Sequence, residues 1–172
     1  MMYPADLFYG AAINRALKNA GGFAHCIADY RFSVSLLILR GQLDTLCRVY
    51  GLQVAADQGR YIKAFLGKRI REEVDRTGAK LTDRVLVQHL EKVRPGVSDM
   101  YDALAGSAHL SVTHFLSTFS VPDHEGRFSG TTHEQDEDVA IDEYAAVCLS
   151  FVGVTETLLD AFNAYGEEGR NK

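Results

Sequence analysis

Three residues could carry chemistry because of their types and their surroundings, and these are Arg40, Asp44 and His109. Arg40 and Asp44 lie four positions apart in the apolar segment LLILRGQLDTLCRVY, so on a helix they share one face and can pair. Charges inside an apolar segment need partners, because desolvation of an unpaired ion is costly. Two interpretations follow: a structural ion pair that sets helix register, or one wall of a binding or catalytic pocket.

His109 belongs to the run YDALAGSAHLSVTHFLSTF, where it shares a helical face with Asp102. A different face carries Ser107, Ser111 and His114. His109 is therefore either a buried histidine hydrogen-bonded to a carboxylate, or a general base or ligand-binding group. The two histidines are five residues apart and do not meet on a regular helix. No ExxH, HExxH or Cys/His cluster is present, so we expect no metal site.

The composition predicts one soluble globular domain over residues 1–172, with 47% apolar and 24% charged residues. A net charge of −5 gives no general attraction for nucleic acid or an anionic membrane, so an RNA contact needs a local basic patch. Residues 60–71 hold five basic residues and no acid, which is either such a patch or a solvated helix face. No phosphate loop or GxSxG motif is present, and we expect no cofactor.

The cysteines, the N-terminal residues and the short apolar run predict a cytoplasmic protein with no membrane contact. Three widely spaced cysteines form no CxxC pair and are expected to be reduced thiols. The first ten residues lack the basic and apolar regions of a secretory signal. The apolar run from Val34 to Leu39 is far shorter than the roughly 20 residues that a membrane helix needs.

Apolar spacing predicts an all-α helical bundle of about five to six helices. Gly21-Gly22 is expected to stop the first helix, and Thr82 and Ser98 are expected to cap later ones. The polar stretch near 117–135 is expected to be a loop or a small β-hairpin. The expected helices cover residues 4–19, 23–50, 60–76, 83–92, 98–119 and 141–165.

The order of these segments resembles uncharacterised bacterial helical proteins near the HEPN superfamily. The likeness lies in LLILRGQLDTLCRVY, GKRIREEVDRTGAKLTDRVLVQHL and VSDMYDALAGSAHLSVTHF, followed by a polar insert and a long final helix. An Arg-x-x-x-Asp/Glu motif and a Ser-x-x-His-x-Ser motif recur in that group. Arg40 with Asp44 matches the first. The run GSAHLS, with Ser107, His109 and Ser111, is similar to the second but has one residue fewer before the histidine.

Catalytic HEPN proteins are metal-independent ribonucleases, often in toxin or phage-defence systems, and their Arg-x(4–6)-His motif is assembled across a homodimer. The resemblance therefore implies a homodimer in bacterial defence or toxin systems. This chain has no arginine five to seven residues before His109. Arg84 with His89 and Arg127 with His133 have the spacing, and the first pair falls on an expected helix. The resemblance therefore implies a possible RNA substrate and a possible cognate partner protein.

Three hypotheses remain open at the level of the sequence. In the first, the protein is a ribonuclease with His109 as acid or base, Arg40 stabilising phosphate charge and Asp44 orienting one of them. In the second, it is a non-catalytic, homodimerising interaction module with a degenerate site. In the third, it binds a small ligand between helices, with the same polar cluster as the floor of the site.

Overall fold

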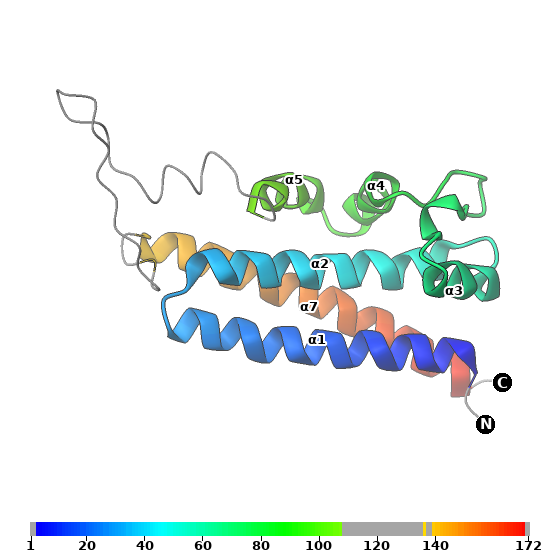
Figure 1. Ribbon diagram of the computed structural model, residues 1–172, viewed down its shortest axis with the longest axis horizontal. Helices are drawn as coiled ribbons and strands as arrows, with labels where there is room; N and C mark the ends of the chain where they lie inside the picture. The colour runs from blue at the N-terminus through cyan, green and yellow to red at the C-terminus, as the bar shows by residue number, and fades with distance from the viewer. Residues whose placement is uncertain (1–2, 108–135, 137–138, 171–172) are drawn as a thin grey trace.

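The computed structural model describes residues 3–107, 136 and 139–170, and over these residues the protein is all-α (Figure 1). Three long helices, α1 (Pro4–Ala28), α2 (Phe32–Val54) and α7 (Ile141–Arg170), pack lengthwise. The expected all-α bundle is confirmed. The remaining elements are α3 (Gln58–Leu66), the 3₁₀ turn η1 (Ile70–Glu72), α4 (Asp83–Val93) and α5 (Val97–Ser107).

Helix α2 is the centre of the bundle and packs against α1, α3, α4, α5 and α7. The expectation of an enclosed helix is confirmed for its second half, where the leucines from Leu39 to Leu52 are almost completely buried, but not for its first half, where Val34 and Leu37 are 42% and 45% exposed. On the opposite wall, Val154 and Leu158 of α7 are also fully buried. Burial of apolar side chains at this density is the main source of stability for the fold.

A buried polar clasp fixes the register of the three long helices. Gln42 of α2 is fully buried, accepts a 3.0 Å hydrogen bond from Asn19 of α1 and donates one of 3.1 Å to Thr155 of α7. Both ends of the amide are therefore satisfied inside the core. A satisfied buried amide specifies one alignment of its neighbours, because any shift would leave it unpaired.

The first helix continues past Gly21-Gly22, so the expected stop there is wrong. The reason is tertiary: Phe23 is buried beyond the glycines and stacks on Phe151 of α7 with ring centroids 4.0 Å apart. That burial outweighs the helix cost of about 1 kcal/mol for each glycine. The chain turns instead at Tyr30, which has φ 55°. Hydrogen bonds from Arg31 to Cys26 and from Tyr30 to Ile27 form a Schellman cap there.

The expected helix over 60–76 is also wrong in extent, because α3 ends at Leu66. Lys68, at φ 57°, forms a second cap of the same type without a glycine. Downstream, Asp75 is buried and accepts hydrogen bonds from Thr77 and Ala79, which closes a tight turn. Within the described ranges, extended pairing is limited to two isolated bridges, Ala55 with Asp75 and Val74 with Lys80.

Helices α4 and α5 form a hairpin that lies across one side of α2 (Figure 1). Thr82 caps α4 by accepting from the amide of Val85, as expected. Glu91 accepts hydrogen bonds of 2.8 and 2.7 Å from the amides of Gly96 and Ser98, and so joins the end of α4 to the start of α5. The insert expected near 117–135 lies outside the described residues.

Candidate functional site

A chain of alternating charges crosses the bundle from α1 to the segment that follows α3. Asp44 of α2 pairs with Arg15 of α1 at 3.0 Å and with Arg48 at 3.2 Å. Arg48 also pairs with Asp83 of α4 at 2.6 Å, and Asp83 pairs with Arg71 at 3.0 Å. We call these five residues the arginine–aspartate chain. It connects four parts of the sequence that lie far apart.

The middle of this chain is partly buried, and its members stay charged at neutral pH. Burial of Arg48 favours its neutral form, but Asp44 and Asp83 outweigh burial and raise the pKa of the guanidinium. Burial likewise opposes ionisation of Asp83, yet Arg48 and Arg71 together lower the pKa of that carboxyl. Neither group is tuned towards proton exchange near pH 7, so the chain is suited to binding and positioning.

Arg40 does not pair with Asp44 in the described structure, which corrects the expected ion pair. Its guanidinium lies over the ring of Tyr101 on α5, 4.1 Å from the ring centroid. Asp44 uses the other residue at helical spacing, Arg48, and adds Arg15 from α1. Arg40 and Asp44 are therefore one turn apart on α2 but serve different neighbouring helices.

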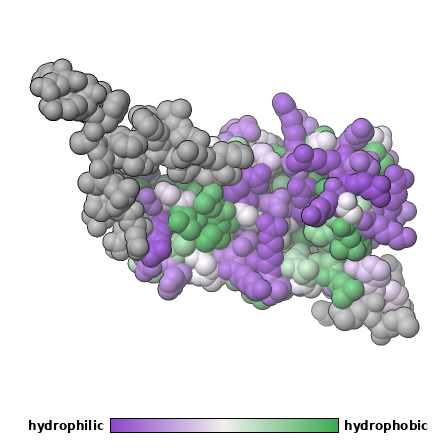
Figure 2. Space-filling view, in the orientation of Figure 1, coloured by the Kyte–Doolittle hydropathy of each residue, from purple (hydrophilic) through white to green (hydrophobic). Residues whose placement is uncertain are grey.

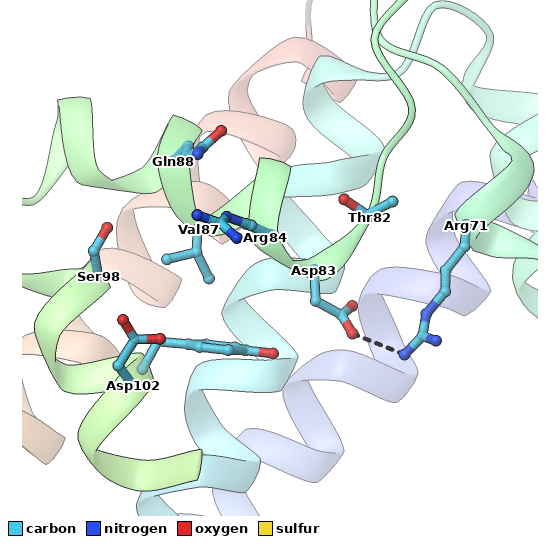
Figure 3. Close-up of a pocket in the computed structure, with 9 residues that line it drawn as sticks. Arg71, Thr82, Asp83, Arg84, Val87, Gln88, Ser98 and Asp102 are labelled. Atoms are coloured by element: carbon cyan, nitrogen blue, oxygen red, sulfur yellow. Dashed lines mark hydrogen bonds and ion pairs between the residues drawn. The ribbon is translucent and has the colours of Figure 1, made fainter.

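A cleft of about 580 Å³ lies beside the α4–α5 hairpin (Figure 3). Two candidates from the sequence, Arg84 and Asp102, line it, and both are exposed. Arg84 has no ion pair with any residue that the structure describes. Figure 3 shows Arg84 and Gln88 on α4, with Ser98 and Asp102 facing them from α5. The full lining is Arg71, Thr82, Asp83, Arg84, Val87, Gln88, Ser98, Tyr101 and Asp102.

His89 is on the same helix as Arg84 but does not line this cleft. Its Nε2 lies 3.2 Å from Asp75, whose side chain is 3% exposed. The hydrogen bonds from Thr77 and Ala79, together with the charge of His89, lower the pKa of Asp75 against the effect of burial. His89 therefore anchors the turn after Val74 on α4. The structure does not bring Arg84 and His89 together as a catalytic pair.

The remaining candidates from the histidine run cannot be placed. His109, Ser111 and His114 lie outside the described residues. Ser107 is the last residue of α5, and its side chain is not described either. The structure therefore places Arg40, Asp44, Asp102, Arg84 and His89, and of these only Arg84 and Asp102 share a cavity.

A second cavity, which the sequence did not predict, lies between α1, α2 and α3 and encloses about 310 Å³. Asp44, Arg15 and Arg48 form its polar end, and its walls are apolar. It was missed because its lining comes from three separate segments. The sequence pattern that could have indicated this cavity is the spacing of Leu7, Ala11 and Arg15, which places them on one face of α1.

Cys47 of α2 directly precedes Arg48 in the sequence, and it is not a nucleophile at neutral pH. Burial, followed by the negative charge of Asp44, raises the pKa of Cys47 to about 12. A buried thiol of this kind behaves as a small apolar side chain. Among the described residues, no group of three His, Cys, Asp or Glu side chains is placed to hold a metal ion.

Helix α7 is long and apolar enough, over Ile141–Glu167, to cross a membrane by length and composition. In the bundle, 28% of its most apolar window is buried, whereas a soluble core helix that meets the same criterion is mostly buried. The absence of membrane contact, expected from a different apolar run, stays a prediction. No protein-family model, curated protein or solved structure matches this chain.

Proposed function

We propose that this protein is a non-catalytic interaction module built on a HEPN-like helical bundle. One observation supports this choice over a ribonuclease: the two described members of the expected catalytic set are held in separate structural contacts. Asp44 has both carboxylate oxygens on arginines, and the Arg40 guanidinium lies on Tyr101. A phosphate-stabilising arginine and an orienting carboxylate would instead have to converge on one reacting group.

The proposal includes a homodimer in the cytoplasm and a role in bacterial defence or RNA-related stress, with a cognate protein as the partner. These parts rest on the resemblance of the sequence. Sedimentation of the purified protein tests the oligomeric state directly. A monomer at all concentrations would remove the dimer from the proposal.

The catalytic question is tested by incubating the purified protein, in the presence of a metal chelator, with single-stranded and structured RNAs. We expect no cleavage. We also expect Arg40→Ala and Asp44→Asn to lower the melting temperature, because each loses a contact that holds two helices together. Metal-independent cleavage that Asp44→Asn abolishes at an unchanged melting temperature would contradict the proposal and restore the ribonuclease.

A second candidate function, RNA association, is favoured by the cleft beside α4 and α5. Arg84 is exposed there without an ionic partner in the described structure, and hydrogen-bonding side chains surround it. Such a cation can contact one phosphate. Fluorescence anisotropy with a labelled single-stranded RNA tests this: Arg84→Ala should weaken binding and make it less sensitive to salt. Arg76→Ala is the matched control, because Arg76 is exposed and outside the cleft.

A further inference from the structure

The pocket between α1, α2 and α3 has the form of a small-molecule site, with an open apolar mouth and an apolar base. Its volume of about 310 Å³ lies at the lower end of the range for ligand pockets, roughly 300 to 1,000 Å³. At the base, Phe8 is buried and meets Phe65 edge to face, with centroids 5.1 Å apart. At the mouth, Leu7 is 59% exposed and Leu66 is 75% exposed.

Two arginines, Arg15 and Arg48, line the polar end of the pocket together with Asp44. Arg48 also pairs with Asp83 outside the lining, at 2.6 Å, which leaves Arg15 as the arginine with a single carboxylate partner. The Arg15 side chain is 49% exposed, so its guanidinium can donate hydrogen bonds to a further anion. The Nη1 nitrogen of Arg48 is buried and has no hydrogen-bond partner in the described structure. A buried guanidinium nitrogen without an acceptor is costly, and a ligand or water oxygen would offset that cost.

The apolar walls and the polar end together define the chemistry of the ligand. We propose that the pocket binds an amphipathic carboxylate, with its carboxylate at Arg15 and a medium-length apolar chain between Leu7, Phe65 and Leu66. A guanidinium binds a carboxylate through two parallel hydrogen bonds. A monoanion beside Arg15 meets less repulsion from Asp44 than a phosphate dianion would, because the repulsion grows with the charge of the ligand. The apolar walls exclude a small hydrophilic acid as the preferred ligand, because it would leave them exposed to water.

This site goes beyond the proposed function and does not depend on it. It uses a different cavity from the RNA candidate, and it requires neither a partner protein nor a dimer. Loss of RNA or protein binding would therefore leave it unaffected.

The experiment is isothermal titration calorimetry with decanoate, held below its micelle-forming concentration, against the full chain. Decanol and decyltrimethylammonium are the ligand controls, since they keep the apolar chain and change the charge. We expect saturable binding of decanoate and weaker binding of both controls. Arg15→Ala should weaken decanoate binding by at least about tenfold, because it removes a charge-assisted hydrogen bond.

Two further variants test where the ligand sits. Ala11→Trp fills the pocket from an exposed position on α1 and should abolish binding; Ala24→Trp, exposed on the same helix outside the pocket, should not change it. Leu66→Asp places an acid at the exposed mouth and should weaken decanoate binding while leaving the melting temperature within a degree or two. Arg84→Ala is the charge control in the other cavity.

Three results would overturn the proposal. The first is no saturable binding of decanoate. The second is equal binding of decanoate and decanol together with no effect of Arg15→Ala, which would indicate apolar adsorption alone. The third is binding that persists in both Ala11→Trp and Leu66→Asp, which would place the ligand elsewhere.

Discussion

The arginine–aspartate chain contributes residues to both cavities, but the remaining lining of the two cavities differs. Asp83 and Arg71 of the arginine–aspartate chain line the cleft beside α4 and α5, while Asp44 and Arg15 line the pocket between α1, α2 and α3. The cleft is lined mainly by polar side chains from a single hairpin, whereas the pocket has apolar walls from three helices.

The two ends of the chain therefore lie in different surroundings. In the polar cleft, water competes for Arg71 and Arg84, so each contact is weak and additive. In the apolar pocket, the guanidinium groups already pair with carboxylates of the chain, so an added anion would share them with those carboxylates. On the face shown in Figure 2, hydrophobic residues gather in separate patches among hydrophilic ones.

The largest expected effect comes from removing Arg48, the residue that joins the two halves of the chain. Arg48→Ala leaves Asp44 and Asp83 as partly buried carboxylates without their shared cation. We expect a loss of about 3 kcal/mol in the free energy of unfolding, measured by urea denaturation. Arg84→Ala is the control and should change stability by less than about 0.5 kcal/mol. Equal effects of the two variants would show that the chain contributes nothing specific.

The next effect tests packing rather than charge, at the contact of α2 with α3 and α4. Gly51 of α2 faces the hydroxyl end of Tyr61 from α3 and a methyl group of Leu86 from α4, and an added Cβ would collide with Tyr61. Gly51→Ala should lower the free energy of unfolding by about 2 kcal/mol, because both neighbours are fully buried. Gly10→Ala, where the added carbon meets nothing, should raise it by up to about 1 kcal/mol. Thermal melts monitored by circular dichroism distinguish the two signs.

The third prediction concerns the pH dependence of the cleft end of the chain. The pKa of Asp83 is lower in the folded protein than in the unfolded chain, so its contribution to stability is present above the unfolded value of about 3.9. That contribution is lost as the pH falls through the folded pKa. At pH 7, Asp83→Asn should be less stable than the wild type by about 1 to 2 kcal/mol.

The measurement is urea denaturation of both proteins between pH 7 and pH 3. The difference between them should stay constant down to about pH 5 and then shrink. A difference that grows as the pH falls would contradict the assignment of Asp83 as a carboxylate stabilised by Arg48 and Arg71.

The smallest effect is on reactivity and leaves stability unchanged. Cys47 lies on α2 between Asp44 and Arg48 in the sequence. Its raised pKa of about 12 makes the thiolate scarce at pH 7.5. We expect negligible alkylation of Cys47 by iodoacetamide in the native protein and complete alkylation in urea, measured by peptide mass spectrometry. Rapid native labelling would show that the core around the arginine–aspartate chain opens readily.

Sequence reasoning succeeded where a signal was local and repeated. The apolar spacing predicted the burial of α2 from Leu39 to Leu52, and the threonine at position 82 predicted the start of α4. It failed at Gly21-Gly22 and at Tyr30, because long-range burial of Phe23 outweighs a local stop, and a tyrosine occupies a cap position usually held by glycine. The partner of Asp44 was also misassigned, since Arg40 and Arg48 both lie one turn away.

The sequence by itself determined the class of the fold, the presence of charged residues on the central helix and the separation of the chain into helices of roughly the right number. Only the tertiary structure decided which charges meet. Arg15, Asp44, Asp83 and Arg71 come from separate segments, and their pairing depends on how α1 and α4 pack on α2. The physical reason is range: helix periodicity is set by neighbours within one or two turns, whereas an ion pair or a pocket is set by the global packing of elements.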